Sequence, residues 1–181
     1  SPGVPNPRGM EPASPSALAT GQPVPNPTRP AGQPPTPAQA GQSLREWILP
    51  RVLELSYTSH RIAGYARDIL GLSDDADPGP PFRWRPERRE LLRAELDSAM
   101  FHLYGLTRPE VEHVLDSFFV VRKYEERDHG EFRTKRLVLQ VYDAMTRAAE
   151  TGIPYRTVLD PPPGEGPRHA AQQHTVKESV R

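Results

Sequence analysis

The stretch "FHLYGLTRPEVEHVLDSF", Phe101 to Phe118, predicts two helices joined by a tight turn. Gly105 ends the first helix, because glycine takes a left-handed conformation without steric penalty. Thr107 stands three residues before Glu110, which is the spacing of a capping box that begins a second helix. Helix, glycine turn and helix is also the outline of a DNA-reading motif, so the stretch either reads DNA or only packs.

The outward side of the second helix argues against base reading. A recognition helix has to approach phosphates and base edges, which favours basic side chains. Arg108 is the one firmly basic residue on this side, and the other outward positions are Glu110, Glu112, His113 and Asp116. We therefore expect the helix pair to pack rather than to read DNA. Four residues are predicted to share its core: Leu96, Leu103, Val114 and Leu115.

A longer helix precedes the glycine turn, from Arg85 to Gly105. Pro86 suits its first turn, where the missing N–H group of proline is not needed. The apolar residues of one face recur at helical intervals, at Leu92, Leu96, Ala99 and Leu103. The opposite stripe carries Arg85, Arg89, Arg93 and Asp97.

Three further regions show the same periodicity. Residues 49–70 predict two helical segments, and residues 108–117 predict the helix after the turn, with Val111, Val114, Leu115 and Phe118 facing inward. Residues 132–150 predict a final helix that Gly152 and Pro154 end. The fold class is therefore all-α, a compact domain of four or five helices.

The two ends of the chain have a different composition from its middle. Residues 1–42 are rich in proline and contain no aromatic residue, no isoleucine and few charges. Such a segment cannot bury enough apolar surface to offset its conformational entropy. Residues 161–181 are again polar, with prolines at their start. We predict a disordered arm or linker over 1–42, a helical domain over 43–160 and a disordered tail over 161–181.

Charge and residue usage exclude several functional classes. The formal net charge is zero, so no strong global field attracts nucleic acid or membrane. The absence of cysteine excludes disulfides, thiol catalysis and cysteine-rich zinc sites. No apolar run approaches the ~20 residues that span a bilayer, and no signal peptide opens the sequence. The expected location is the cytoplasm, and the initial serine suggests a piece of a longer protein.

No catalytic motif is complete in the sequence. The six histidines lack the spacing of a helical metal site, and there is no G-x-S-x-G elbow, P-loop or glycine-rich dinucleotide loop. "LDPPPGEG", from Leu159, resembles the adenine-holding motif of DNA methyltransferases, but Pro163 stands where the stacking aromatic ring is required. We therefore expect no catalytic, cofactor-binding or metal-binding residue in this chain, and interpret this stretch as a proline-rich exit from the domain.

Basic residues supply the remaining functional signal. Five of them lie before and within the start of the final helix and are candidates for contact with DNA backbone: Arg122, Lys123, Arg133, Lys135 and Arg136. Acidic residues interrupt this cluster at Glu125, Glu126, Asp128 and Glu131. The other interpretation is therefore a solvated, salt-bridged surface.

Four blocks together resemble the C-terminal region of large bacterial restriction–modification adenine-specific DNA methyltransferases. The blocks are "PRVLELSYTSHRIAGYARD", "GPPFRWRPERRELLRAELDSAMFHLYGLTRPEVEHVLDSFFVVRK", "GEFRTKRLVLQVYDAM" and "GIPYRTVLDPPP". Their order and spacing follow that family through nearly all of residues 44–163. Two departures are Phe119, where the family more often has proline, and residues 1–42, which look unlike its specificity domain.

The resemblance implies a role within a larger protein. In the family the S-adenosyl-L-methionine site and the catalytic motif lie upstream, so this chain alone is expected to be inactive. The whole protein methylates adenine in a specific DNA sequence, usually in defence against phage. The resemblance implies an accessory segment that packs on the methyltransferase and recognition domains, of the same protein or of an adjacent polypeptide, and contacts DNA backbone. No membrane or metal partner is expected.

A second functional class is a non-enzymatic helical protein-interaction module. Its arm would be the ligand of a partner, since "PTRPAGQPPTP" contains P-x-x-P spacing that suits aromatic grooves. Such spacing is expected by chance in a segment this rich in proline. A plain linker is therefore the simpler interpretation of the arm.

Overall fold

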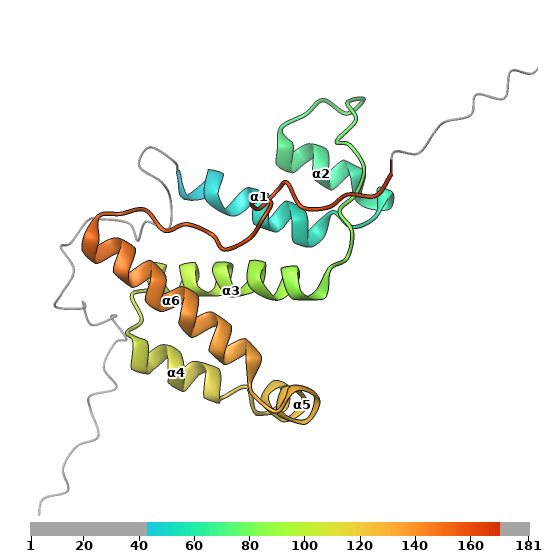
Figure 1. Cartoon of the computed structure of the whole chain (residues 1–181). Helices are drawn as coiled ribbons and strands as arrows, with labels where there is room; N and C mark the ends of the chain where they lie inside the picture. Colours follow the sequence, from blue (N-terminus) through green and yellow to red (C-terminus); the bar gives the residue numbers. More distant parts are fainter. Residues whose placement is uncertain (1–42, 171–181) are drawn as a thin grey trace, which may run out of the picture.

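The computed structural model describes residues 43–170, and the helices in this range confirm the all-α prediction (Figure 1). The predicted arm, 1–42, and the end of the predicted tail, 171–181, lie outside the described residues. The helices are α1 (Leu44–Ser56), the short 3₁₀ turn η1 (His60–Ile62), α2 (Ala63–Leu70), α3 (Pro86–Leu103), α4 (Arg108–Asp116), α5 (Phe119–His129) and α6 (Arg133–Thr151).

Local sequence signals place the beginnings of two helices. Ser43 and Glu46 form a capping box at the start of α1. Thr107 and Glu110 form the predicted one at α4, where the Thr107 backbone N–H donates to the Glu110 carboxylate at 2.7 Å. Between α3 and α4, Gly105 has the predicted left-handed conformation, with φ of 72°.

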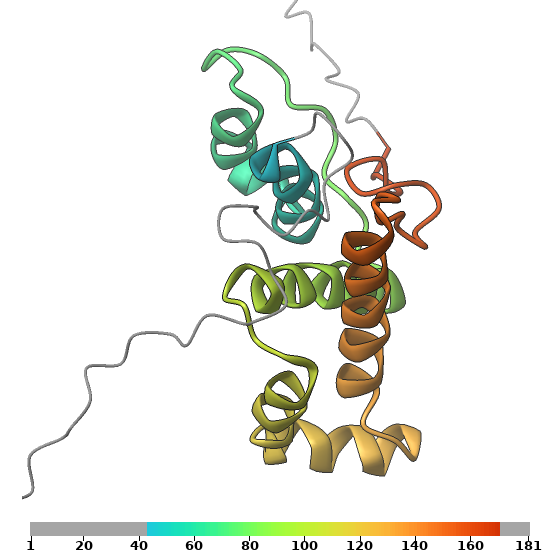
Figure 2. The same cartoon turned by 90° about the vertical axis from the view of Figure 1, so that its left-hand side faces the viewer.

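The main core lies where α6 crosses α3 and α4. Figures 1 and 2 show α6 running across α3, with α4 beneath them and α1 on the other side of α3. Val111 and Leu115 of α4 are buried against Val138 and Met145 of α6 in one cluster, and Trp47 of α1 joins it. A smaller core of Leu53, Tyr57, Ala66 and Phe82 holds α2 and the following loop against α1.

Two residues of the predicted core are more exposed than expected. Leu115 is buried, Leu96 packs against the cluster and Val114 is half-buried, but Leu103 is 44% exposed. Leu103 is the last residue of α3, and Phe101 packs against the core from that turn. Phe118, predicted to face inward, is 47% exposed because α4 ends before it.

Arg89 lies on the stripe opposite the apolar face of α3, yet it is buried. Its guanidinium lies 3.6 Å from the centre of the Trp84 ring and donates a hydrogen bond of 2.9 Å to the Leu55 carbonyl. α1 covers this side of α3 as well, so α3 has protein on two faces (Figure 2). A pattern that assumes a single buried face therefore places Arg89 wrongly.

The C-terminal segment, residues 153–170, runs back along α1 and α3 after α6 ends (Figure 1). The Arg83 N–H donates to the Pro167 carbonyl at 2.8 Å, and the His169 N–H donates to the Pro81 carbonyl at 2.8 Å. The folded part therefore extends to residue 170, beyond the predicted boundary at 160, because backbone hydrogen bonds and buried side chains hold this polar, proline-rich stretch.

Candidate interaction surface

Helix α5 is the α-helix with the least burial among the described residues. None of its residues is buried, whereas α3, α4 and α6 each bury several side chains. No helix was expected over these residues from the sequence. Its apolar residues are adjacent rather than periodic, so no helical face stands out in the sequence.

One side of α5 presents large apolar side chains to solvent. At about 100° per residue, Phe119, Val120, Lys123 and Tyr124 lie within one side of the helix. Phe119 is 74% exposed, and Val120 and Tyr124 are also exposed. We call these four residues the α5 surface. Glu125 lies toward α6, because its carboxylate hydrogen-bonds Thr134.

Four of the five candidate DNA-contacting residues have carboxylate partners. Arg122 pairs with Glu126 at 2.7 Å, and Arg133 pairs with Glu90 at 2.9 Å. Lys135 and Arg136 pair with Asp116 at 2.7 Å and with Glu131 at 3.0 Å, respectively. The hydrogen bonds from these two cations lower the pKa values of both carboxyls, so the acids remain ionised at neutral pH.

The start of α6 also has an internal anion. The Thr134 N–H and hydroxyl donate to the two carboxylate oxygens of Glu125, at 2.8 and 2.6 Å. A phosphate at this helix terminus would have to displace that carboxylate. Within the described residues, Lys123 is the one member of the candidate cluster for which no carboxylate partner is found.

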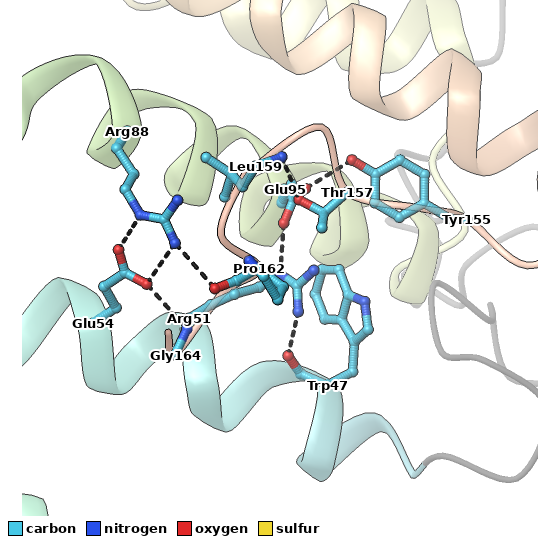
Figure 3. Close-up of polar contacts among 10 residues, drawn as sticks. All are labelled: Trp47, Arg51, Glu54, Arg88, Glu95, Tyr155, Thr157, Leu159, Pro162 and Gly164. Carbon is cyan, nitrogen blue, oxygen red and sulfur yellow. Dashed lines mark hydrogen bonds and ion pairs between the residues drawn. The ribbon is translucent and has the colours of Figure 1, made fainter. Parts of the chain in front are cut away.

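A buried ionic network joins α1, α3 and the C-terminal segment (Figure 3). The Arg51 guanidinium donates to Glu95 at 2.7 Å and to the Trp47 carbonyl at 2.6 Å. The Tyr155 hydroxyl donates to the other Glu95 oxygen at 2.8 Å. Burial, together with the charge of Glu95, raises the pKa of Tyr155, which keeps the phenol protonated as a donor.

A second ion pair holds the proline-rich stretch that follows α6 in place. Glu54 pairs with Arg88 and accepts a hydrogen bond of 3.0 Å from the Gly164 N–H, while Arg88 donates to the Pro162 carbonyl at 3.1 Å (Figure 3). Gly164 has φ of 90°, a conformation that other residues rarely adopt. The "DPPPGEG" stretch is thus bound to α1 and α3 and has a structural role.

Neither network resembles a catalytic centre. Both oxygens of Glu95 and of Glu54 are engaged by cations or hydrogen-bond donors of the fold itself. A groove of about 340 Å³ opens between α3, α6 and residues 153–158, but its lining is mainly apolar, with Arg147 and Arg156 as its charged members. Among residues 43–170, no group of histidines and carboxylates is placed to hold a metal ion.

Comparison with known proteins gives no relative. No protein-family model, curated protein or solved structure matches the chain. In the described part of the chain, no helix is long and apolar enough to cross a membrane. The resemblance to DNA methyltransferases therefore rests on the four sequence blocks alone.

Proposed function

We propose that this chain is a C-terminal accessory segment of a site-specific adenine DNA methyltransferase of a restriction–modification or phage-defence system. Its role is to pack against the part of the enzyme that carries the methyl-donor and recognition sites. The family assignment comes from the sequence blocks, and the packing role is supported by one structural observation: the α5 surface is exposed and apolar.

Packing through α5 is supported by the energetics of apolar surface. Phe119, Val120 and Tyr124 keep much of their apolar area in water. Removing such area from water contributes about 25 cal/mol per Å². Clustered exposed apolar side chains of this kind often mark interaction sites. The α5 surface therefore offers a partner a source of binding free energy that the isolated domain leaves unused.

The second part of the proposal, contact with DNA backbone, has less support from the structure than the packing role. Arg133, Lys135 and Arg136 already have carboxylate partners, so a phosphate would have to replace them. The Arg136–Glu131 pair is exposed, and exposed pairs contribute only about 0–1 kcal/mol, which makes the exchange feasible at that residue. The side chains of Arg133 and Lys135 are only 27% and 25% exposed. Replacing all three by alanine in the complete enzyme tests this half: weaker binding to all DNA sequences alike supports contact, and unchanged binding excludes it.

Two variants of the complete enzyme test the packing role. Phe119→Ser combined with Tyr124→Ser removes aromatic area from the α5 surface. The matched control, Tyr104→Ser combined with Val158→Ser, removes exposed apolar area elsewhere. We expect the first variant to lose adenine methylation and the control to keep it. Equal methylation by both variants would reject the packing role.

The alternative proposal is a non-enzymatic interaction module. The α5 surface supports it equally, since an exposed apolar helix face does not specify the chemistry of its partner. The coding sequence next to this chain discriminates between the two. A glycine-rich donor loop and an N-P-P-aromatic motif upstream support the methyltransferase proposal, and their absence supports the alternative.

A further inference from the structure

Another exposed aromatic side chain, Trp84, lies in the segment between α2 and α3. Trp84 is 60% exposed, whereas Trp47, the other tryptophan of the chain, is buried. The backbone of this segment is held in place, because Phe82 is buried and the Arg83 N–H donates to the Pro167 carbonyl. Core packing therefore does not explain why this segment presents an indole to solvent.

The Trp84 ring is held in place on one face only. The Arg89 guanidinium stacks 3.6 Å from the ring centre, and Arg89 itself is buried and bound to the Leu55 carbonyl. Because this contact covers one face and the side chain remains largely exposed, the other face of the indole is open to solvent. A fixed ring with a free face loses little conformational entropy when a flat group stacks on it.

Three arginines that form no direct ion pair lie close to Trp84 in the sequence. Arg83 and Arg85, its chain neighbours, are exposed, and so is Arg93, one helical turn beyond Arg89. Among the ion pairs of residues 43–170, none involves Arg83, Arg85 or Arg93. This contrasts with the candidate cluster at α6, where acids pair with the cations.

The local charge balance is positive. Burial is the main cause that lowers the pKa of Arg89, and the nearby charge of Arg93 lowers it further, which places the two cations close together. The acidic neighbours are Glu87, in the first turn of α3, and Asp97, one turn beyond Arg93. Glu54 also acts on Arg89 but is paired with Arg88. Arginines still outnumber carboxylates around the exposed ring when this pair is included: Arg83, Arg85, Arg88, Arg89 and Arg93 against Glu54, Glu87 and Asp97.

We infer that Arg83, Trp84, Arg85 and Arg93 form a binding surface for single-stranded nucleic acid. An unpaired base stacks on the open face of Trp84, and the three arginines contact the phosphates on either side. Stacking platforms set among cations are the usual means of binding single strands without sequence preference. The free arginines favour a polyanion over a proline-rich peptide, which carries no charge complementary to them.

This inference does not depend on the proposed methyltransferase role, because it concerns other residues and the chain alone. The test is titration of the 181-residue chain with a labelled 15-nucleotide oligo(dT), followed by anisotropy and by tryptophan fluorescence. We expect saturable binding with quenching of Trp84. Trp84→Ala should weaken binding by about tenfold, since stacking contributes ~1–3 kcal/mol per base. Trp84→Phe should retain most of the affinity and lose the quenching.

The charges are tested by a triple variant, Arg83→Ala, Arg85→Ala and Arg93→Ala. These side chains are exposed, so the fold should persist even if Trp84→Ala impairs it. We expect the log–log salt slope to fall by about 0.7 for each lost contact. Arg147→Ala with Arg156→Ala, two exposed arginines at the α3–α6 groove, is the control and should bind as the wild type does.

Three results would overturn the inference. The first is no binding of oligo(dT) at 50 mM salt, a probe condition at which phosphate contacts are strong. The second is wild-type affinity and salt slope in the triple variant. The third is binding of a proline-rich peptide that depends on Trp84 while oligo(dT) does not compete with it.

Discussion

At the scale of single residues, Glu95 of α3 is the centre of the buried ionic network. It is fully buried and joins Arg51 of α1 to Tyr155 of the C-terminal segment. Such a charge is stable in the interior only when all its partners are present, since removing one leaves the other charge unpaired. We expect Glu95→Ala to lower the free energy of unfolding by about 3–5 kcal/mol, measured by urea denaturation.

Glu112→Ala is the matched control for that variant. Glu112 also pairs with an arginine, Arg108, but both side chains are partly exposed, and exposed pairs contribute about 0–1 kcal/mol. A similar loss of stability in both variants would contradict the structural role of the buried network.

A second residue-scale prediction concerns pH. The pKa of Glu110 is lowered chiefly by the Thr107 backbone N–H and then by the Thr107 hydroxyl. A carboxyl with a lowered pKa stabilises the fold above its unfolded pKa, and this contribution is lost as pH falls through the folded pKa. Glu110→Ala should therefore destabilise the domain at pH 7, and the difference from wild type should shrink below about pH 4. A difference that stays constant down to pH 2 would show that the capping carboxylate is not its source.

Contacts between individual side chains are the feature that is hardest to predict from the sequence. Arg51 and Glu95 stand far apart in the chain, and no local pattern links them. The five candidate DNA-contacting residues could be named from the sequence, but their carboxylate partners on α3 and α4, Glu90 and Asp116, could not. Side-chain pairing between elements depends on how the helices cross, which helical periodicity does not specify.

At the scale of the elements, the contrast between Leu115 and Leu103 tests the packing of α3, α4 and α6. Leu115 is buried in the main core, whereas Leu103 is half-exposed at the end of α3. We expect Leu115→Ala to lower the free energy of unfolding by about 2–5 kcal/mol, through lost contacts and the cavity left behind. Leu103→Ala should change it by about 0.5 kcal/mol or less. Equal losses would mean that both leucines belong to the core, as the sequence alone suggests.

Helices with one periodic apolar face could be predicted from the sequence, and α5 could not. α3, α4 and α6 were expected within one or two residues of their observed bounds, because caps, Pro86 and glycine turns mark their ends. In α5 the apolar residues Phe119, Val120 and Val121 are consecutive, so together they spread over about 200° of the helix rather than recurring along one narrow stripe. A helix that buries no side chain leaves no periodic signal, so the element that carries the candidate surface is the one that the pattern misses.

At the scale of the whole molecule, we expect the C-terminal segment to stabilise the domain. Ending the chain after residue 160 removes the backbone groups that pair with the Arg83 N–H and the Pro81 carbonyl. It also removes the Gly164 N–H and the Pro162 carbonyl, which add to the Glu54–Arg88 ion pair. Buried polar groups left without partners cost about 1–3 kcal/mol each. We expect this truncation to lower the free energy of unfolding by about 2 kcal/mol or more relative to a chain that ends after residue 170. Equal urea midpoints for the two chains would show that residues 161–170 do not stabilise the domain.

We propose that the α5 surface links this domain to a methyltransferase, and isothermal titration calorimetry tests this proposal most directly. The chain is titrated into the polypeptide, encoded with it, that carries the methyl-donor site. We expect saturable binding that weakens at least tenfold in Phe119→Ser/Tyr124→Ser and is unchanged in the control Tyr104→Ser/Val158→Ser. Binding that is absent in the wild type, or equally strong in the α5 variant, would contradict the assignment of this surface as the packing interface.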